Sequence, residues 1–274
     1  PTNSFWNYSG WNIDNVVLVG NYISKDVGIT DWIAPTSGCG HTNEEYVTVT
    51  IKNFAGDPLI DPLPLSFSFN GGTTIYKDTI QSPNLAVEGS LTYQITKPVD
   101  LSVPGWYNNI YVTTNLPLDE DATNNRFDTV LFISPTYTVP YSQNFETNYG
   151  YYRTGGANSS WAYGTPAGTL INSAASGTKA WVTSLASTYN NNENSYLETP
   201  CFNFTGIDYP VFEFKAKGMS EADIDGMALY YSINDGVSWV LVPNNNDFIW
   251  SWYNKASISS LGGPGLDLTG GEWK

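Results

Sequence analysis

Short runs of alternating apolar and polar residues recur along the chain, separated by Gly, Pro, Asn and Asp. The clearest run is Tyr46-Val-Thr-Val-Thr-Ile-Lys52, which places Val47, Val49 and Ile51 on one face of a strand. Continuous runs with helical periodicity are scarce. Short strands separated by turn residues, at intervals of about 8–12 residues, are typical of β-sandwiches. The pattern therefore predicts an all-β protein.

Residues 21–134 carry the pattern of one complete sandwich. Asn70-Gly-Gly72 predicts a hairpin turn, because glycine tolerates positive φ. Seven strands in roughly 110 residues indicate an immunoglobulin-like sandwich, although the Cys-Trp-Cys pattern of antibody domains is missing. The predicted strands cover residues 26–30, 46–52, 65–70, 74–80, 91–96, 109–114 and 126–133.

Residues 135–274 form a second predicted β-sandwich. The segment Ser134-Pro-Thr-Tyr-Thr-Val-Pro140 joins it to the first, and its two prolines make this linker semi-rigid. We expect strands at residues 180–184, 195–202, 211–216, 227–233 and 239–242.

The two ends of the chain suggest interrupted modules. Residues 1–20 contain a turn and one alternating strand, Trp11-Asn-Ile-Asp-Asn-Val-Val-Leu-Val-Gly20, which is interpreted as the closing strand of a preceding module. Residues 135–274 lack a closing strand of that kind and are interpreted as incomplete at their C-terminus. The chain is therefore expected to be a window from a longer array of alternating modules.

Four features of residues 24–133 carry a resemblance to a known module. They are Asn53 with Gly56 after the second strand, the Glu88-Gly89-Ser90 turn, Pro104-Gly105 before a strand, and an acidic loop ending in Asn124-Asn125. Together they resemble the bacterial CARDB-type domain, an immunoglobulin-like module related to cell adhesion. The family usually shows Asn-x-Gly, so the additional residue before Gly56 predicts a bulge. The resemblance implies a fold rather than an activity.

A second resemblance covers residues 140–274. The carrying runs are Pro140-Tyr-Ser-Gln-Asn-Phe-Glu146, Ser159-Ser-Trp-Ala-Tyr-Gly164, Tyr196-Leu-Glu-Thr-Pro-Cys201 and Ser232-Ile-Asn-Asp-Gly-Val-Ser-Trp239. They are similar to the MAM-like jelly rolls of bacterial surface proteins, which include the cleaved-adhesin and choice-of-anchor J modules. The resemblance implies a jelly-roll β-sandwich, with the closing strand of such a fold in residues 1–20. It also implies a multi-domain protein carried by the type 9 secretion system of gliding bacteria.

The charge balance narrows the range of partners. The chain has 26 Asp and Glu against 11 Lys and Arg, a formal net charge of −15. Nucleic acid is excluded as a partner, because binding it requires a basic surface. The absence of any run of 18 apolar residues argues against a membrane-embedded protein. The acidity fits either solubility or recruitment of Ca²⁺.

The chain has two cysteines, Cys39 and Cys201, which is too few for a disulfide framework and gives no CxxC zinc pattern. Three interpretations stay open: a bond between the two modules, a bond to a partner outside the chain, or small buried apolar side chains. The low Lys content and the abundance of Asn, Thr and Tyr favour a secreted or cell-surface protein.

Catalytic constellations are missing from the sequence. His41 is the single histidine, and neither a GxSxG nucleophile motif nor a second histidine for a zinc site accompanies it. Glu213 alternates with apolar residues and is expected to point outward from a strand rather than to act as an acid with a raised pKa. We expect a protein that is not an enzyme.

Two regions offer oxygen ligands for a structural Ca²⁺. Glu221-Ala-Asp-Ile-Asp-Gly226 has the spacing of half an EF-hand loop, so Asp223 and Asp225 are candidate ligands; the alternative is a simple turn before a strand. The jelly-roll resemblance implies a Ca²⁺ ligand directly after the Asn-Phe of the first strand, a position that Glu146 occupies.

Aromatic residues supply the candidate ligand-binding site. Trp250-Ser-Trp252-Tyr253 lies in a loop-like stretch and is a candidate platform for sugar rings, with core packing as the alternative. Ser232 to Trp239 resembles the Asp-box hairpin, S-x-D-x-G-x-x-W, with Asn234 in the Asp position. That hairpin is a folding device, in which the polar side chain ties the turn and the Trp packs beneath it.

These observations favour a structural or adhesive segment of a secreted or cell-surface modular protein, with neighbouring modules of the same chain, and glycans or a surface polysaccharide, as partners. The first alternative is a carbohydrate-binding accessory module of a larger secreted enzyme. The second is a protease-associated domain that assists substrate capture.

Overall fold

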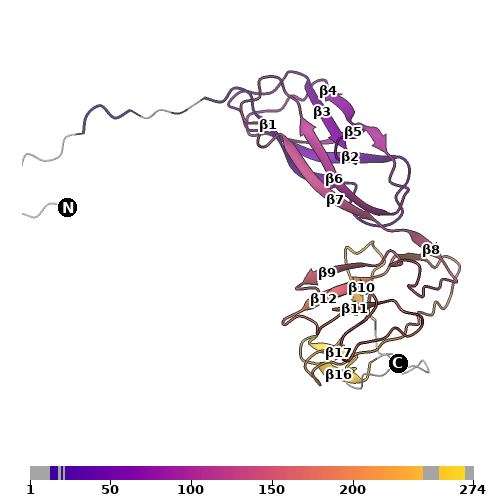
Figure 1. Cartoon of the computed structure of the whole chain (residues 1–274). Helices are drawn as coiled ribbons and strands as arrows, with labels where there is room; N and C mark the ends of the chain where they lie inside the picture. Colours follow the sequence, from indigo (N-terminus) through magenta and orange to yellow (C-terminus); the bar gives the residue numbers. More distant parts are fainter. Residues whose placement is uncertain (1–12, 18–19, 21, 243–252, 269–274) are drawn as a thin grey trace, which may run out of the picture. The chain divides into compact units, whose positions relative to one another are not determined.

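The computed structural model describes residues 13–17, 20, 22–242 and 253–268 (Figure 1). The described residues contain strands β1 to β17 and no helix, which confirms the prediction of an all-β protein. Accordingly, no helix in the described part of the chain has the length and apolarity needed to cross a membrane. The chain divides into unit 1, composed of Pro1–Ala34, Val47–Lys97 and Ile110–Thr129, and unit 2, composed of Pro35–Tyr46, Pro98–Asn109 and Val130–Lys274.

The first seven strands form two sheets, with the orders β1-β2-β5 and β4-β3-β6-β7. All seven strands expected in this region are present, and the last has the bounds that were expected. The strands are β1 (Val27–Ala34), β2 (Glu45–Asn53), β3 (Leu63–Ser68), β4 (Tyr76–Ile80), β5 (Ser90–Val99), β6 (Gly105–Thr114) and β7 (Arg126–Ile133).

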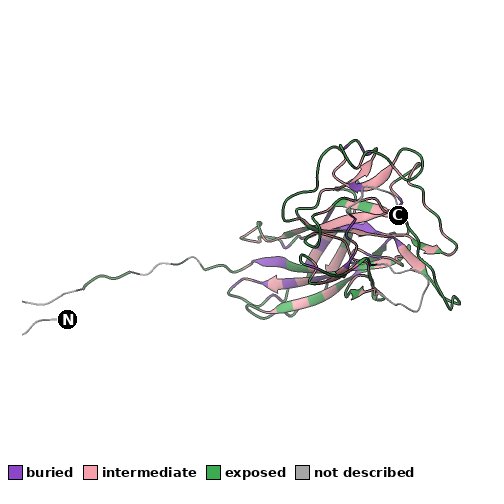
Figure 2. Ribbon diagram, turned by 90° about the horizontal axis from the view of Figure 1, so that it is seen from below, coloured by how far each residue is buried: buried purple, intermediate pink, exposed green. Residues whose placement is uncertain are grey.

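The apolar faces of these strands make the core of unit 1. Val47, Val49 and Ile51 of β2 are fully buried, as their alternation with threonine predicts. Figure 2 shows purple buried residues on the strands, with green exposed residues on the same strands and in the loops. Further fully buried side chains come from β3, β5 and β6: Leu63, Leu65, Phe67, Ile95, Ile110 and Val112.

Asn53 at the end of β2 organises the neighbouring loops. Its buried side-chain amide donates hydrogen bonds to the carbonyls of Asp57 (2.8 Å), Leu85 (3.2 Å) and Ala86 (3.1 Å). Its side-chain oxygen accepts a hydrogen bond from the backbone N–H of Ala55 (3.0 Å). The asparagine singled out by the first resemblance thus joins the backbones of two loops through its own side chain, whose buried amide is satisfied by them.

The remaining strands are short and form five two-stranded sheets. β8 pairs with β13 in parallel, and the other pairs, β9 with β12, β10 with β11, β14 with β15 and β16 with β17, are antiparallel. Their bounds are β8 (Thr136–Thr138), β9 (Arg153–Ala157), β10 (Trp161–Gly164), β11 (Ala180–Thr183), β12 (Asn194–Glu198), β13 (Cys201–Asn203), β14 (Tyr230–Tyr231), β15 (Val240–Leu241), β16 (Lys255–Ile258) and β17 (Gly263–Gly265).

Four expectations for this region need correction. The linker at residues 134–140 contains a strand, β8. The strand expected at residues 195–202 is divided into β12 and β13 at Pro200, which has no N–H to donate to a ladder. The strand expected at residues 211–216 is absent, and that expected at 227–233 is reduced to β14, because alternation produces a strand only where a neighbouring strand is available to pair with it.

We predict that Asn53→Ala lowers the free energy of unfolding by about 2 kcal/mol, because the buried amide no longer ties the Asp57 loop to the Leu85–Ala86 loop. Chemical denaturation followed by tryptophan fluorescence measures this change. The matched control is Asn115→Ala, because the exposed Asn115 amide bonds only the Ser66 hydroxyl and, more weakly, the Thr113 carbonyl of β6, so a loss below about 1 kcal/mol is expected. Equal losses in the two variants would contradict the role of Asn53.

Candidate functional site at the Cys39–Cys201 disulfide

The loop between β14 and β15 is closed by its own side chains. The Ser232 hydroxyl accepts hydrogen bonds from the backbone N–H groups of Asn234 (3.3 Å) and Gly236 (2.9 Å). The Asn234 side-chain oxygen accepts from the N–H of Ser238 (3.0 Å), and its amide nitrogen donates to the Ser238 hydroxyl (2.8 Å). The polar side chains therefore tie this turn, as the resemblance to the Asp-box hairpin led us to expect. The other half of that expectation is wrong, because Trp239 is 46% exposed instead of packed beneath the turn.

The loop between β3 and β4 has the same hydrogen bonds. The Ser68 hydroxyl accepts from the N–H groups of Asn70 (3.3 Å) and Gly72 (2.9 Å). The Asn70 side chain accepts from the N–H of Thr74 (2.8 Å) and donates to the Thr74 hydroxyl (3.2 Å). The two loops share the pattern S-x-N-x-G-x-[S/T], so Asn70-Gly-Gly72 is more than a glycine turn. The repeated pattern is visible in the sequence, although its significance becomes clear only from the matching hydrogen bonds.

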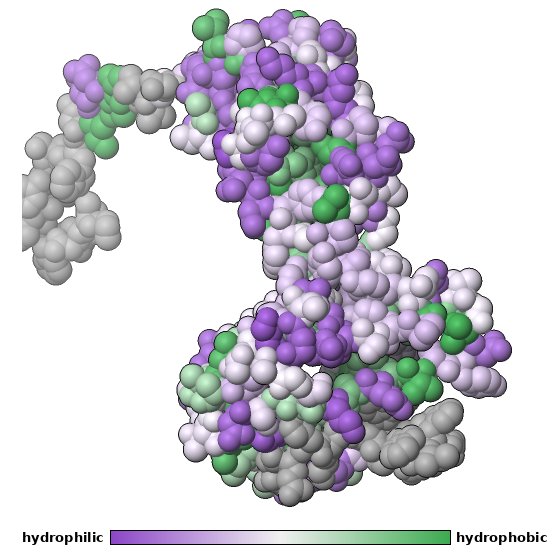
Figure 3. All heavy atoms as spheres, turned by 45° about the vertical axis from the view of Figure 1, so that its right-hand side comes forward, coloured by the Kyte–Doolittle hydropathy of each residue, from purple (hydrophilic) through white to green (hydrophobic). Residues whose placement is uncertain are grey.

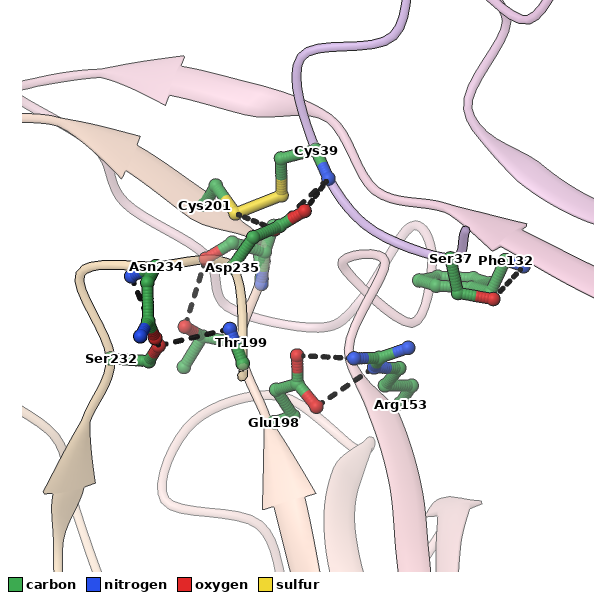
Figure 4. A network of polar contacts seen from close by, with 12 residues as sticks. Ser37, Cys39, Phe132, Arg153, Glu198, Thr199, Cys201, Ser232, Asn234 and Asp235 are labelled. Atoms are coloured by element: carbon green, nitrogen blue, oxygen red, sulfur yellow. Dashed lines mark hydrogen bonds and ion pairs between the residues drawn. A yellow bond between two sulfur atoms is a disulfide. The ribbon is translucent and has the colours of Figure 1, made fainter. Parts of the chain in front are cut away.

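The two loops differ in the residue that follows the central asparagine. The residue after the central asparagine has a positive φ in both, 67° at Gly71 and 57° at Asp235. Aspartate is one of the few residues with a side chain that adopts this conformation. Gly71 carries no side chain there, whereas Asp235 directs its carboxylate toward Cys39, as Figure 4 shows.

Cys39 and Cys201 form a disulfide with each other, and both lie in unit 2. Of the three interpretations left open by the sequence, the bond between the two cysteines is therefore the correct one. The backbone N–H of Cys39 donates to both carboxylate oxygens of Asp235, at 3.1 and 3.3 Å. The nearer oxygen lies 3.8 Å from Cys201 Sγ. Since the bond joins residues separated by 162 positions, it closes a long loop.

The loop that carries Cys39 is also bound to the end of β7. The N–H of Gly38 donates to the carbonyl of Phe132 (3.1 Å), and the N–H of Ser134 donates to the carbonyl of Gly38 (2.8 Å). The Ser37 hydroxyl accepts from the N–H of Phe132 (3.0 Å). On the other side of the disulfide, the N–H of Cys201 donates to the carbonyl of Pro135 (3.2 Å). Both sulfur-bearing segments are therefore held by backbone hydrogen bonds as well as by the covalent bond.

A half-buried ion pair belongs to the same region. Arg153 of β9 donates two hydrogen bonds to Glu198 of β12, at 2.8 and 2.7 Å (Figure 4). Burial opposes a charged guanidinium, but the bonds to Glu198 and the nearby Asp235 carboxylate raise the pKa of Arg153 overall. The guanidinium carbon also lies 5.9 Å from the centre of the Phe132 ring. A bidentate pair of this kind fixes the register of β9 and β12.

Cys39, Cys201 and Asp235 are the single group of three or more potential metal-ligating residues that lies close together in the described part of the chain. Thiolates rather than disulfide sulfurs bind metals. With the two sulfurs bonded to each other, the cluster acts as a covalent crosslink with a carboxylate beside it.

Glu146, Asp223 and Asp225, the candidate calcium ligands, are each engaged by protein donors. Glu146 accepts hydrogen bonds from the backbone N–H groups of Thr178 and Lys179, and these bonds lower the pKa of its carboxyl. Asp225 accepts from the hydroxyl of Tyr189 (2.8 Å). Glu146 thus stabilises the turn at 178–179, and Asp223 and Asp225 belong to a single turn at 221–226. Neither candidate is part of a close group of three or more potential metal ligands among the described residues.

Asp223 pairs with the ammonium group of Lys255, which also lies 3.6 Å from the buried Asp267 carboxylate. Asp267 accepts further hydrogen bonds from the N–H of Asp223 (3.0 Å) and the hydroxyl of Ser220 (3.3 Å). Asn254 exchanges two hydrogen bonds with the backbone of Asp267. A lysine thus supplies the positive charge between the two carboxylates in this turn.

Of the three residues proposed as a sugar platform, the structure describes Tyr253. Trp250 and Trp252 lie outside the described residues. Tyr253 is only 4% exposed, and its hydroxyl is hydrogen-bonded to the backbone N–H and carbonyl of Leu229. Tyr253 therefore packs into unit 2 and does not present its ring to a ligand.

His41 lines an open depression of about 320 Å³ together with Ser102, Pro104 and Ser134. Its Nδ1 lies 3.6 Å from Glu45 Oε2. Burial opposes the charged form of Glu45, but hydrogen bonds from Thr42 and the nearby imidazole lower its pKa. Among the described side chains, no serine hydroxyl is hydrogen-bonded to His41, so a nucleophile–base pair is not formed in this part of the structure.

Comparison with known proteins gives one partial similarity. No protein-family model and no solved structure matches the chain. The chain is 34% identical over 93 residues to Bacillopeptidase F of Bacillus subtilis (strain 168), which corresponds to 34% of this chain and 6% of that protein. The similarity is that of a segment and does not assign an activity.

We predict that Asp235→Asn accelerates reduction of the disulfide by glutathione about two- to five-fold at low ionic strength. The attacking thiolate is an anion, and a carboxylate beside the sulfur repels it. Samples quenched at successive times and assayed for free thiols give the rate constant. Asp208→Asn, an exposed residue that changes the net charge equally, is the control and should leave the rate unchanged. Equal acceleration in the two variants would show that overall charge, not the position of Asp235, determines the rate.

We predict that the Glu146 carboxyl titrates below its ordinary pKa of about 4.3, because its ionised form accepts the N–H groups of Thr178 and Lys179. A lowered folded-state pKa contributes stability above the unfolded pKa, and this contribution is lost as the pH falls through the folded pKa. A carboxyl ¹³C NMR titration of folded and urea-unfolded chain measures the difference. Glu146→Gln should remove this part of the acid dependence. A midpoint that moves with millimolar calcium would instead support a calcium site at Glu146.

Proposed function

We propose that the chain is a structural and adhesive segment of a secreted or cell-surface modular protein and is not itself an enzyme. The observation that carries the proposal is the disulfide between Cys39 and Cys201. Disulfides persist mainly in oxidising compartments, which is consistent with an extracellular location. A bond that closes a loop of this length stabilises a module mainly by restricting its unfolded chain.

The use of the carboxylates supports the same function. Glu193 accepts hydrogen bonds from the backbone N–H groups of Ser160 (2.9 Å) and Asn190 (3.0 Å) and from the hydroxyl of Ser195 (2.6 Å). Glu146 binds the 178–179 backbone in the same manner. Acidic side chains that hydrogen-bond to loop backbones stabilise the fold, as an extracellular segment requires, and do not serve acid–base chemistry in a cleft.

The resemblances extend the proposal. An immunoglobulin-like module of the CARDB type, followed by a MAM-like jelly roll, would make this chain part of a surface array in which neighbouring modules are the first partners. Linked modules of this kind gain reach and multivalency. A structural Ca²⁺ at Glu146 and transport by a gliding-type secretion system belong to the same proposal.

A carbohydrate-binding accessory role is the second candidate, and the exposed indoles favour it. Trp106 is 58% exposed, and Trp239 is partly exposed beside the Gly236 turn. Indole faces stack on sugar rings where they are accessible. The partial similarity to Bacillopeptidase F supports a further variant of this role, in which the segment assists a protease carried by the same chain.

We predict that the full chain shows no saturable binding on a glycan array, and that the disulfide sets its resistance to proteolysis. Thermolysin should cleave Cys201→Ser, or the reduced wild type, at least ten-fold faster than the oxidised wild type, because more of the chain is open at equilibrium. Gel densitometry over time measures the cleavage. Saturable binding of one polysaccharide, removed by Trp252→Ala or Trp106→Ala, would establish the accessory role instead. Equal cleavage rates would contradict the structural proposal.

A further inference from the structure

The disulfide and the Asp235 carboxylate place three potential metal-ligating groups at one point of unit 2. The two sulfurs and a carboxylate oxygen lie within 4.8 Å of one another. Asp235 Oδ1 is 3.8 Å from Cys201 Sγ, close to the distance of about 3.6 Å that separates a sulfur and an oxygen bound to one tetrahedral zinc ion. Figure 4 shows the carboxylate turned toward both cysteines. The cluster therefore has the spacing of a ligand set once the two sulfurs separate.

Separating the two sulfurs requires rotation of side chains rather than movement of the backbone. The Cα atoms of Cys39 and Cys201 are 6.3 Å apart. Two sulfurs bound to a tetrahedral zinc ion lie about 3.8 Å apart, because each Zn–S bond is about 2.3 Å long. Rotation about the two Cα–Cβ bonds moves the sulfurs over this range while the Cα atoms stay in place. The reduced side chains are therefore able to hold an ion between them.

Both cysteine segments are attached to the same stretch of chain, residues 132–138, by contacts that do not involve sulfur. Gly38, next to Cys39, exchanges two backbone hydrogen bonds with this stretch, and the N–H of Cys201 donates to the carbonyl of Pro135. β13, which begins at Cys201, pairs with β8. The loop of the third ligand is tied by its own side chains. These contacts keep the three groups close together when the S–S bond is broken.

The ligand types and their exposure favour zinc over calcium or magnesium. Asp235 is exposed and the two cysteines are half-buried, so an ion reaches the cluster from solvent. Thiolates select Zn²⁺, whereas Ca²⁺ and Mg²⁺ take oxygen ligands. Figure 3 shows hydrophilic residues across the face in view, and the 26 Asp and Glu of the chain offer many carboxylates to such hard cations. The two sulfurs distinguish this cluster from those carboxylates.

We propose that, when Cys39 and Cys201 are reduced, their two thiolates and the Asp235 carboxylate bind one Zn²⁺ ion, which replaces the disulfide as a crosslink. Glutathione, a thiol reductant, supplies the two electrons: the S–S bond breaks, two cysteine thiols form, and two glutathione molecules become one disulfide. Zn²⁺ then displaces the two thiol protons, which pass to solvent, and water completes the tetrahedron. The inference does not depend on the proposed function, because it concerns these three ligands whatever the module binds.

The first test is a titration of the full chain with Co²⁺, a spectroscopic substitute for Zn²⁺. The chain is reduced with a phosphine, which is then removed by gel filtration in the absence of oxygen. We expect a thiolate-to-cobalt charge-transfer band that saturates at one ion per chain and disappears when Zn²⁺ is added. The oxidised chain should show no such band. A reduced chain without the band, or saturation at one ion per two chains, would overturn the proposal.

The second test uses variants of the carboxylate. Asp235→Asn should weaken Zn²⁺ binding by the reduced chain at least about ten-fold, because one of the three protein ligands is lost. Competition with a chromophoric zinc chelator measures the affinity. Asp208→Asn, at an exposed residue of the same unit, removes the same charge and should bind Zn²⁺ as the wild type does. Equal affinities of Asp235→Asn and the wild type would mean that two thiolates of an unfolded chain hold the ion, and the proposal would be wrong.

The third test asks whether the ion replaces the crosslink. Zn²⁺ at about ten times its measured Kd should slow cleavage of the reduced wild type by chymotrypsin about ten-fold, because an ion that binds the folded state lowers the population of the open chain. Cleavage of Cys201→Ser, which keeps a single thiolate, should be unaffected by Zn²⁺. Cleavage of the reduced wild type at the same rate with and without Zn²⁺ would rule out a crosslink through the ion.

Discussion

The bond between Cys39 and Cys201 is the constraint on which unit 2 depends. The ladders of this unit are short: β12 has five residues, β13 has three and β14 has two. Ladders of this length add little stability by themselves. Closing a loop of 162 residues contributes up to about 5 kcal/mol in the chain-entropy description, which is comparable with the whole stability of many domains. The covalent bond thus supplies the stabilisation that longer strands supply in other β-proteins.

The turn beside the disulfide shows how one local design serves two purposes. Ser68 to Thr74 and Ser232 to Ser238 fold by the same hydrogen bonds, which the shared pattern S-x-N-x-G-x-[S/T] supplies. The position of positive φ then becomes available for a further role. Glycine at that position leaves the loop as a connection, whereas Asp235 binds the N–H of Cys39 and places a negative charge beside the sulfurs.

The sequence predicted best where a strand buries one face. The alternation of Val47, Val49 and Ile51 gave both β2 and its buried side, because burial of every second residue determines the register. It failed at residues 211–216, where the same alternation is present but no strand forms. Alternation identifies a segment that is able to form a strand. Whether the strand forms depends on a pairing segment that is distant in the chain.

The candidate site was harder to predict for the same reason. Cys39 and Cys201 were recognised as a possible pair, but spacing alone does not determine a bond across 162 residues. Asp235 was missed because its role appears only when the loop brings it to Cys39. Glu146 and Asp223 were predicted as Ca²⁺ ligands, and the sequence did not reveal the protein groups that bind them, because these groups, the 178–179 backbone and Lys255, lie more than 30 residues away.

The most direct test of the account is the extension of single molecules pulled from both termini. With the disulfide intact, the residues between Cys39 and Cys201 are shielded from the force, so the fully stretched chain should be about 55 nm shorter than after reduction. Recovery of that length on adding a reducing agent is the predicted result. Equal lengths before and after reduction would show that the crosslink is absent and would contradict the account.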